Sequence, residues 1–246
     1  MGKLNNTKEA QLEQNLIDLL CAQHGQWTFR SDLKTEEDLW NNLRNIIEIR
    51  NKSELNDNML TDSEFKRIRS EILANTKTPF EAAKWLRGEK GKCSVVLERD
   101  NGLGRIELII YSSIEKNGGF SSYEIVHQIA KNKSNLEERS RRFDITLLIG
   151  GLPIIQIELK TAIAKDGVKQ AYYQIEKYID EGTFSNTIFQ TLQLYVMSNE
   201  QTTRYMAAAP KGELQDKFMF GWRTRDNTRV ENINEFAKQV LNIPRA

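Results

Sequence analysis

The chain has 246 residues, of which 39% are hydrophobic and 28% are charged, and its formal net charge is +1. This length allows one large or two small domains with a buried core, and the composition is that of an ordinary globular protein. The nearly balanced charge excludes binding of polyanions through the overall field, so any DNA contact requires a local basic patch.

The cysteine content indicates a reducing environment. Cys21 and Cys93 lie far apart and form no CxxC motif, so we expect a cytoplasmic protein without a thiolate metal site. No apolar run approaches the ~18 residues of a membrane span, and the amino terminus has no signal-peptide pattern. We therefore expect no membrane contact.

Helical periodicity dominates the first ninety residues. The stretch TKEAQLEQNLIDLLCAQHG predicts an amphipathic helix that ends near Gly25, and three more helices are expected over 35–55, 61–75 and 78–88. The expected caps, chosen by residue type and position, are Thr7, Thr35, Thr61 or Asp62, and Gly88.

The pattern changes to that of strands after residue 91. We expect helices at 166–182 and 232–242, and strands at 92–99, 104–113, 123–130, 143–150, 152–160, 191–199 and 203–209. This order predicts a single α/β domain over 1–246, with a mixed sheet flanked by helices. Within it, we expect a helical insertion at 35–90 and the sheet core at 93–210.

The stretch RRFDITLLIGGLPIIQIELK, residues 141–160, combines apolar strands with charged residues. Side chains alternate along a strand, so Glu158 and Lys160 point the same way. A tight turn at Gly150-Gly151 pairs residues near Asp144 with residues near 157. The two carboxylates are thus expected on adjacent strands, at the same end of the sheet.

Two interpretations of this carboxylate pair remain open from spacing alone. The strand end is either a solvated edge or a site for a hard divalent cation such as Mg²⁺, which takes carboxylate oxygens and keeps several waters. In the second case, Lys160 beside the metal orients or helps deprotonate an attacking water, or stabilises charge on a phosphate.

An Asp, a strand hairpin and then Glu-x-Lys resemble the PD-(D/E)xK nuclease superfamily. The core stretch, followed by QIEKY, LQLYVMSN and TRYMAA, looks like the amino-terminal nuclease domain of type I restriction enzyme R (HsdR) subunits. The opening LEQNLIDLL and the tryptophan soon after it fit that family too. The resemblance covers roughly residues 10 to 240, and it implies a restriction-endonuclease-like fold.

The resemblance also implies site residues. It makes Asp144 and Glu158 metal ligands, with the main-chain carbonyl of Leu159 as a further ligand, and Lys160 the catalytic lysine. Further catalytic-site residues are those that match the family's Q-x-x-x-Y element and its acidic residue on the first helix, here Gln174, Tyr178 and Glu13. The chain departs from the superfamily pattern at Phe143, which stands where the name-giving proline is found.

The implied function is that of a type I site-specific deoxyribonuclease. Such a domain cleaves phosphodiester bonds of double-stranded DNA with Mg²⁺, for which Mn²⁺ substitutes. ATP belongs to motor domains of the same parent chain, which we expect outside this sequence, and the partners are methyltransferase and specificity subunits. Two alternatives are a non-catalytic nuclease-like module for DNA binding or assembly, and a stand-alone PD-(D/E)xK nuclease.

Basic residues cluster in the sequence around the core stretch. Two interpretations fit them, a surface that holds the DNA backbone or a solvated loop, and the acidic Glu137 and Glu138 weaken the first. The residues proposed to contact DNA are Arg139, Arg141, Arg142, Lys165 and Lys169, with Lys131 and Lys133 nearby.

Overall fold

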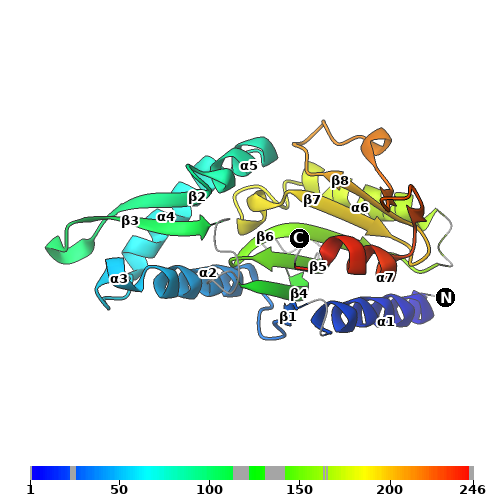
Figure 1. Cartoon of the computed structure of the whole chain (residues 1–246), viewed down its shortest axis with the longest axis horizontal. Coiled ribbons are helices and arrows are strands. Elements are labelled where there is room, and N and C mark those ends of the chain that lie inside the picture. Colours follow the sequence, from blue (N-terminus) through cyan, green and yellow to red (C-terminus); the bar gives the residue numbers. More distant parts are fainter. Residues whose placement is uncertain are drawn as a thin grey trace.

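The computed structural model describes residues 2–22, 26–112, 122–130, 142–162, 164 and 166–243, without the side chains of 2–7, 130 and 142. These residues form a six-stranded sheet with helices on both faces and a second lobe made of helices and one hairpin (Figure 1). The expected α/β class with a mixed sheet is therefore confirmed. No helix in these ranges is long and apolar enough to cross a bilayer.

The six-stranded sheet has the order β1-β4-β5-β6-β7-β8. The pairs β1–β4 and β6–β7 are parallel, and the other three pairs are antiparallel. The strands are β1 (Thr28–Phe29), β4 (Tyr123–Ala130), β5 (Arg142–Ile149), β6 (Leu152–Leu159), β7 (Leu194–Ser198) and β8 (Thr203–Ala207).

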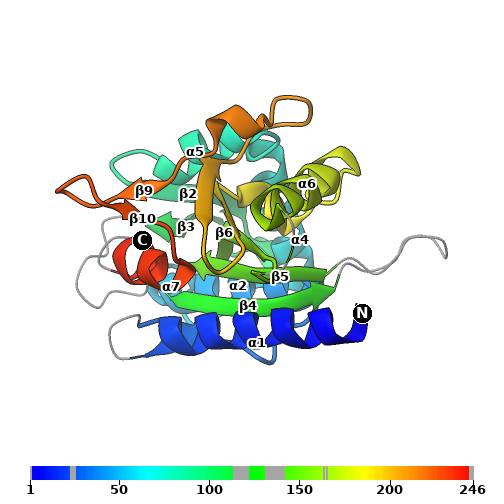
Figure 2. The ribbon, with the colours of Figure 1, turned by 90° about the vertical axis from the view of Figure 1, so that its right-hand side faces the viewer.

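Helices cover the two faces of this sheet and bury two apolar clusters (Figure 2). On one face, α1 (Gly2–Cys21), α7 (Ile233–Phe236) and the π-helical turn η4 (Ala237–Leu241) pack on side chains such as Ile145 and Ile157. On the other face, α6 (Gly167–Asp180) packs on the cluster that also holds Phe143. The strands are apolar on both sides because both faces are covered.

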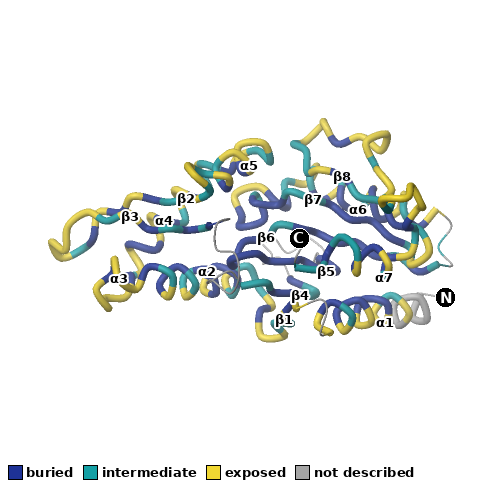
Figure 3. The backbone as a smooth tube through the Cα atoms, viewed as in Figure 1, coloured by how far each residue is buried: buried dark blue, intermediate teal, exposed yellow. Residues whose placement is uncertain are grey.

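The second lobe contains α2 (Glu36–Arg50), α3 (Lys52–Leu55), α4 (Asp62–Asn75), α5 (Pro79–Arg87) and the hairpin of β2 (Lys92–Glu98) and β3 (Arg105–Ser112). This hairpin is a separate two-stranded sheet, so residues 93–112 of the sheet core expected at 93–210 lie outside the six-stranded sheet. One side of the hairpin is buried (Figure 3) because Val95 and Leu108 share a core with Leu43 and Ile68 of the helices.

Helix ends follow the cap residues of the sequence, with one exception. Thr35 and Thr61 accept hydrogen bonds from the main-chain amides of Asp38 and Glu64 in complete capping boxes, and Gly88 closes α5. The prediction that Thr7 caps the first helix is wrong, because α1 already begins at Gly2 and ends at Cys21. The apolar periodicity marks where this helix packs, and it does not mark where the helix begins.

The turn between β5 and β6 needs its two glycines. Gly150 and Gly151 have φ of 61° and 82°, values that side chains with a Cβ rarely adopt. A Cβ on Gly151 would lie 2.8 Å from Cδ1 of Ile46, so α2 packs directly against the turn. The expected hairpin is thus confirmed, and Ile145 pairs with Ile157.

Several short elements were not expected from the sequence. They lie in the connections after α6 and after β8, where no strong periodicity marks them. These elements are η2 (Ile188–Thr191), η3 (Asp216–Phe218), β9 (Trp222–Arg223) and β10 (Arg229–Val230), together with η1 (Asp100–Gly102) at the tip of the β2–β3 hairpin.

Candidate active site

The hairpin brings Asp144 and Glu158 together, as the sequence predicts. Because Ile145 pairs with Ile157, the next step along the ladder sets Asp144 of β5 opposite Glu158 of β6. Both residues are buried, with 8% of Asp144 and none of Glu158 exposed. The strand end is therefore a buried acidic pair, and the alternative of a solvated edge is wrong.

Asp144 is held by the main chain of the neighbouring strand. Its Oδ2 accepts a hydrogen bond from the amide of Leu159 at 2.8 Å. Burial raises the pKa of Asp144 from 3.8 to about 6. The positive charge of Lys160 lowers this pKa in part, and the negative charge of Glu13 raises it further. Near neutral pH this carboxylate is thus much easier to protonate than an exposed aspartate.

Glu158 is oriented by a chain of buried polar groups. The Thr146 hydroxyl donates to Oε1 of Gln156 at 2.7 Å, which turns the amide nitrogen of Gln156 toward Oε1 of Glu158 at 3.1 Å. The second oxygen, Oε2, is buried and has no hydrogen-bond partner among the described residues. Burial, and then the charge of Asp144, raise the pKa of Glu158 well above its ordinary value.

These features fit a hard divalent cation. Two adjacent buried carboxylates, one with an unpartnered oxygen, are costly without a positive charge between them, and Mg²⁺ prefers such oxygen ligands. Leu159 is fully buried, and its amide already bonds to Asp144, so its main chain adjoins the pair. Within the described ranges, no group of three or more His, Cys, Asp or Glu residues is placed to hold a metal ion. Water or phosphate oxygens would therefore complete the coordination.

Lys160 follows directly after β6. Its main-chain amide donates to the Ser198 carbonyl at 2.8 Å, which continues the pairing with β7. Its positive charge opposes the burial-driven rise in the pKa values of Asp144 and Glu158, so it favours the charged form of both carboxylates. A Cβ on Gly167, at the start of α6, would lie 3.3 Å from Cβ of Lys160. The helix therefore begins beside the lysine.

Glu13 reaches the site from α1. Only 4% of this residue is exposed, and its Oε2 is hydrogen-bonded to Nε2 of His127 at 2.6 Å and to Nε2 of Gln128 at 2.8 Å. The resemblance indicated Glu13, but nothing in the sequence pattern linked His127 or Gln128 to it. A hydrogen bond between residues 114 positions apart has no signal in local periodicity.

Gln174 and Tyr178 lie together on α6. Gln174 donates from Nε2 to the Tyr178 hydroxyl at 2.7 Å, and Tyr178 is buried. The Tyr178 ring packs edge to face on Phe143, with 5.1 Å between ring centroids. Phe143 directly precedes Asp144 and stands where the superfamily has proline. Its aromatic contact with Tyr178 thus links this end of β5 to α6.

The basic residues proposed to contact DNA are described only in part. Arg139, Arg141 and Lys165 lie outside the described residues, and Arg142 is described as a strand position without its side chain. Lys169 is exposed in the first turn of α6. The helix that begins beside Lys160 therefore presents one of these proposed cations to solvent.

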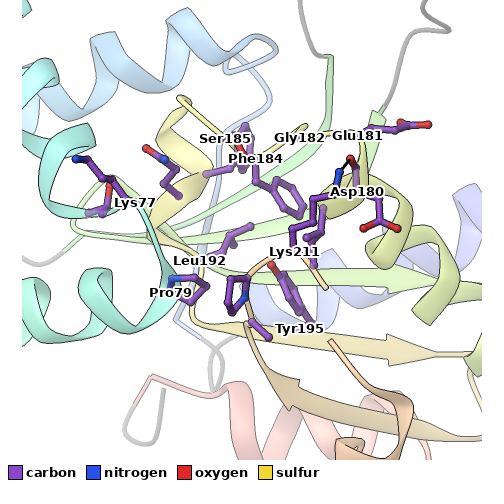
Figure 4. Close-up of a pocket in the computed structure, with 16 residues that line it drawn as sticks. Lys77, Pro79, Asp180, Glu181, Gly182, Phe184, Ser185, Leu192, Tyr195 and Lys211 are labelled. Atoms are coloured by element: carbon purple, nitrogen blue, oxygen red, sulfur yellow. Dashed lines mark hydrogen bonds between the residues drawn. The ribbon is translucent and has the colours of Figure 1, made fainter. Parts of the chain in front are cut away.

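A cavity of about 590 Å³ lies elsewhere, between the α4–α5 connection and the end of α6 (Figure 4). Phe184 and Tyr195 line it, and at its edge Lys211 donates from Nζ to the Asp180 carbonyl at 2.7 Å. None of its lining residues belongs to the acidic pair, so it is separate from the candidate active site.

A mixed sheet with buried carboxylates on adjacent strands and a lysine two residues after the second defines a restriction-endonuclease-like protein. The family model described as "Type I restriction enzyme R protein N terminus" matches residues 6–213. The chain belongs to this family, as the sequence motifs predicted.

Several relatives are named as endonuclease subunits. The chain is 31% identical over 211 residues to the type I restriction enzyme SsaAORF53P endonuclease subunit of Staphylococcus saprophyticus, an alignment that covers 85% of this chain and 20% of the relative. It is 37% identical over 113 residues to the EcoprrI endonuclease subunit of Escherichia coli, covering 44% and 35%. The chain thus spans about a fifth of the length of the staphylococcal relative.

Proposed function

We propose that this chain is the Mg²⁺-dependent nuclease domain of a type I restriction enzyme R subunit and hydrolyses phosphodiester bonds in double-stranded DNA. The observation that carries the proposal is the buried pair of Asp144 and Glu158, with an unpartnered oxygen on Glu158 and the charge of Lys160 beside it. An assembly module without chemistry has no use for so costly an arrangement.

Asp144 and Glu158 would hold the metal, with the carbonyl of Leu159 beside them. When bound, Mg²⁺ supplies a Lewis acid for a phosphate oxygen and lowers the pKa of a coordinated water. Lys160 then orients the attacking water and stabilises the charge that grows on the scissile phosphate. The bond from Leu159 to Asp144 and the bond from Gln156 to Glu158 keep the carboxylates in place between turnovers.

The proposed substrate and partners come from the names and lengths of the relatives. Those are restriction enzyme subunits, so we propose DNA as substrate, ATP-driven motor domains in the same parent chain, and methyltransferase and specificity subunits that supply sequence recognition, all in the cytoplasm. We propose that the DNA backbone is held by the exposed Lys169, together with Arg139, Arg141, Arg142 and Lys165. Such contacts weaken as salt rises.

Metal binding tests the function most directly. Titration calorimetry with Mg²⁺ or Mn²⁺ is expected to show binding to the unmodified protein and none to Asp144→Ala, with unchanged circular dichroism. In the complete restriction enzyme, the same substitution is expected to abolish DNA cleavage. Equal metal affinity of variant and parent would remove the assignment of Asp144 as a ligand.

Gln174→Ala and Tyr178→Phe are expected to reduce DNA cleavage without abolishing it. Each change removes one partner of the hydrogen bond between Gln174 and Tyr178. Losing such a bond costs about 0.5–1.5 kcal/mol, or roughly two- to tenfold in rate. Mn²⁺ affinity should change little, because neither group is a metal ligand. If both variants only lower the melting temperature and cleave at the parental rate per folded molecule, the pair serves packing alone.

A further inference from the structure

Strand β4 contains a backbone irregularity beside the acidic pair. Gln128 has φ of 56°, and within the described residues no other non-glycine residue inside a strand has a positive φ. Such a conformation is unfavourable for a residue with a Cβ. Strained residues inside regular structure persist only where their surroundings hold them, and they gather at functional sites.

The irregularity lies level with Asp144. His127 pairs with Ile145 and Ile129 pairs with Phe143, so the pairs on either side leave Gln128 opposite Asp144. Residues two apart in a strand normally face the same side of a sheet. Phe143 and Ile145 instead face opposite sides of the sheet, because Ile145 packs with α1 and α7 whereas Phe143 packs with α6.

The same switch of sides occurs on β4. Ile125 packs in the cluster of α1 and α7, whereas Ile129, four residues further on, packs in the cluster of α6. Both strands therefore exchange faces at the level of Gln128 and Asp144. At this crossing point the Asp144 carboxylate reaches sideways to the amide of Leu159 on the next strand.

Glu13 holds the irregularity from α1. Neighbouring residues of a regular strand point to opposite faces, yet His127 and Gln128 both bond to the same oxygen of Glu13, at 2.6 and 2.8 Å. The left-handed conformation of Gln128 lets both side chains converge there. Glu13 is buried, so its carboxylate relies on these two partners.

We propose that Glu13 and Gln128 are positioning residues. The bond between them keeps Gln128 left-handed, and this conformation sets the Asp144 carboxylate for the metal. This inference rests on the proposed nuclease function. It assigns Glu13 a role through the backbone of β4, in place of contact with metal or substrate, and it gives Gln128 a role that its residue type does not suggest.

A comparison of two substitutions at Gln128 tests the role of its backbone. Gln128→Val disfavours a positive φ, whereas Gln128→Gly accepts it. We expect Mn²⁺ affinity, measured by calorimetry on the folded proteins, to fall at least tenfold in Gln128→Val and to stay within about threefold in Gln128→Gly, where glycine rescues the site. Asn56→Val replaces another left-handed residue, far from the site in the second lobe, and should leave affinity unchanged.

A double-mutant cycle covers the case in which Gln128→Val does not fold. Glu13→Ala should lower Mn²⁺ affinity at least tenfold in the parent and about threefold or less in the Gln128→Gly background, because glycine no longer needs the clamp. An equal loss in both backgrounds would overturn the proposal and make Glu13 a direct participant. An equal loss in Gln128→Val and Gln128→Gly would overturn it as well.

These outcomes are separate from those of the proposed function. If the unmodified protein binds no Mn²⁺, the metal site itself fails, and the positioning role fails with it. If the unmodified protein binds Mn²⁺ and Gln128→Val binds it within threefold of that affinity, the metal site stands and the positioning role is overturned.

Discussion

Asp144→Asn is expected to stabilise the metal-free protein, and to do so more at pH 8 than at pH 4.5. In the folded protein, burial raises the pKa of Asp144 from 3.8 to about 6. The folded state therefore binds this proton more tightly than the unfolded state does. Asparagine cannot ionise, and its oxygen can still accept the hydrogen bond from Leu159 that Asp144 accepts now.

The direction of the pH effect follows from linkage. Because the pKa of Asp144 is raised on folding, its contribution to the free energy of unfolding is fully present below pH 3.8 and is lost as the pH rises to about 6. Above that pH, the destabilisation caused by the buried charge stays constant. The advantage of Asp144→Asn in free energy of unfolding should thus grow by about 2 kcal/mol between pH 4.5 and pH 8. Urea unfolding with a chelator at both pH values measures it.

Divalent metal should offset most of this advantage. Mg²⁺ at a hundred times its dissociation constant stabilises a folded protein that binds it by about 2.7 kcal/mol, and Asp144→Asn should gain almost none of this. Glu176→Gln changes a half-buried carboxyl on α6 that bonds to the Tyr172 hydroxyl, away from the pair, and serves as the control. A stability difference between parent and Asp144→Asn that is independent of both pH and Mg²⁺ would contradict the proposed metal site.

Lys160→Ala is expected to remove DNA cleavage by the complete enzyme while metal binding persists. The lysine carries no ligand atom for Mg²⁺ while it is charged, but its positive charge acts on the carboxylates that are proposed to hold the ion. Removing a group that stabilises charge in the transition state typically costs about 10²–10³ in rate. Cleavage of plasmid DNA, with Mn²⁺ calorimetry on the same variant, separates the two effects.

A matched lysine controls for loss of charge. Lys177 lies on α6, is 56% exposed in its side chain and contacts only the neighbouring Glu181 among the ion pairs of the described residues. Lys177→Ala should cleave at the parental rate. A rate for Lys160→Ala within about threefold of the parent, or about 0.7 kcal/mol of barrier, would rule out a catalytic role for Lys160.

Part of this protein follows directly from its sequence. Alternating apolar residues and the Gly150-Gly151 turn predicted the hairpin that sets Asp144 opposite Glu158, because strand pairing across a tight turn is a local property. The capping boxes of Thr35 and Thr61 were predictable for the same reason, since each involves residues three apart. The family was predictable because its motif is carried by that same hairpin and helix α6.

Other features were decided only when distant segments met. The β2–β3 hairpin forms its own sheet because α2 and α4 supply its buried face, and strand periodicity does not name a partner. The left-handed Gln128 is held by Glu13, which is 115 positions away in the chain. Burial of Glu158 with one unpartnered oxygen depends on packing from both faces of the sheet. Spacing in the sequence thus determined which carboxylates meet, and the tertiary structure determined the burial and charge that make them a candidate site.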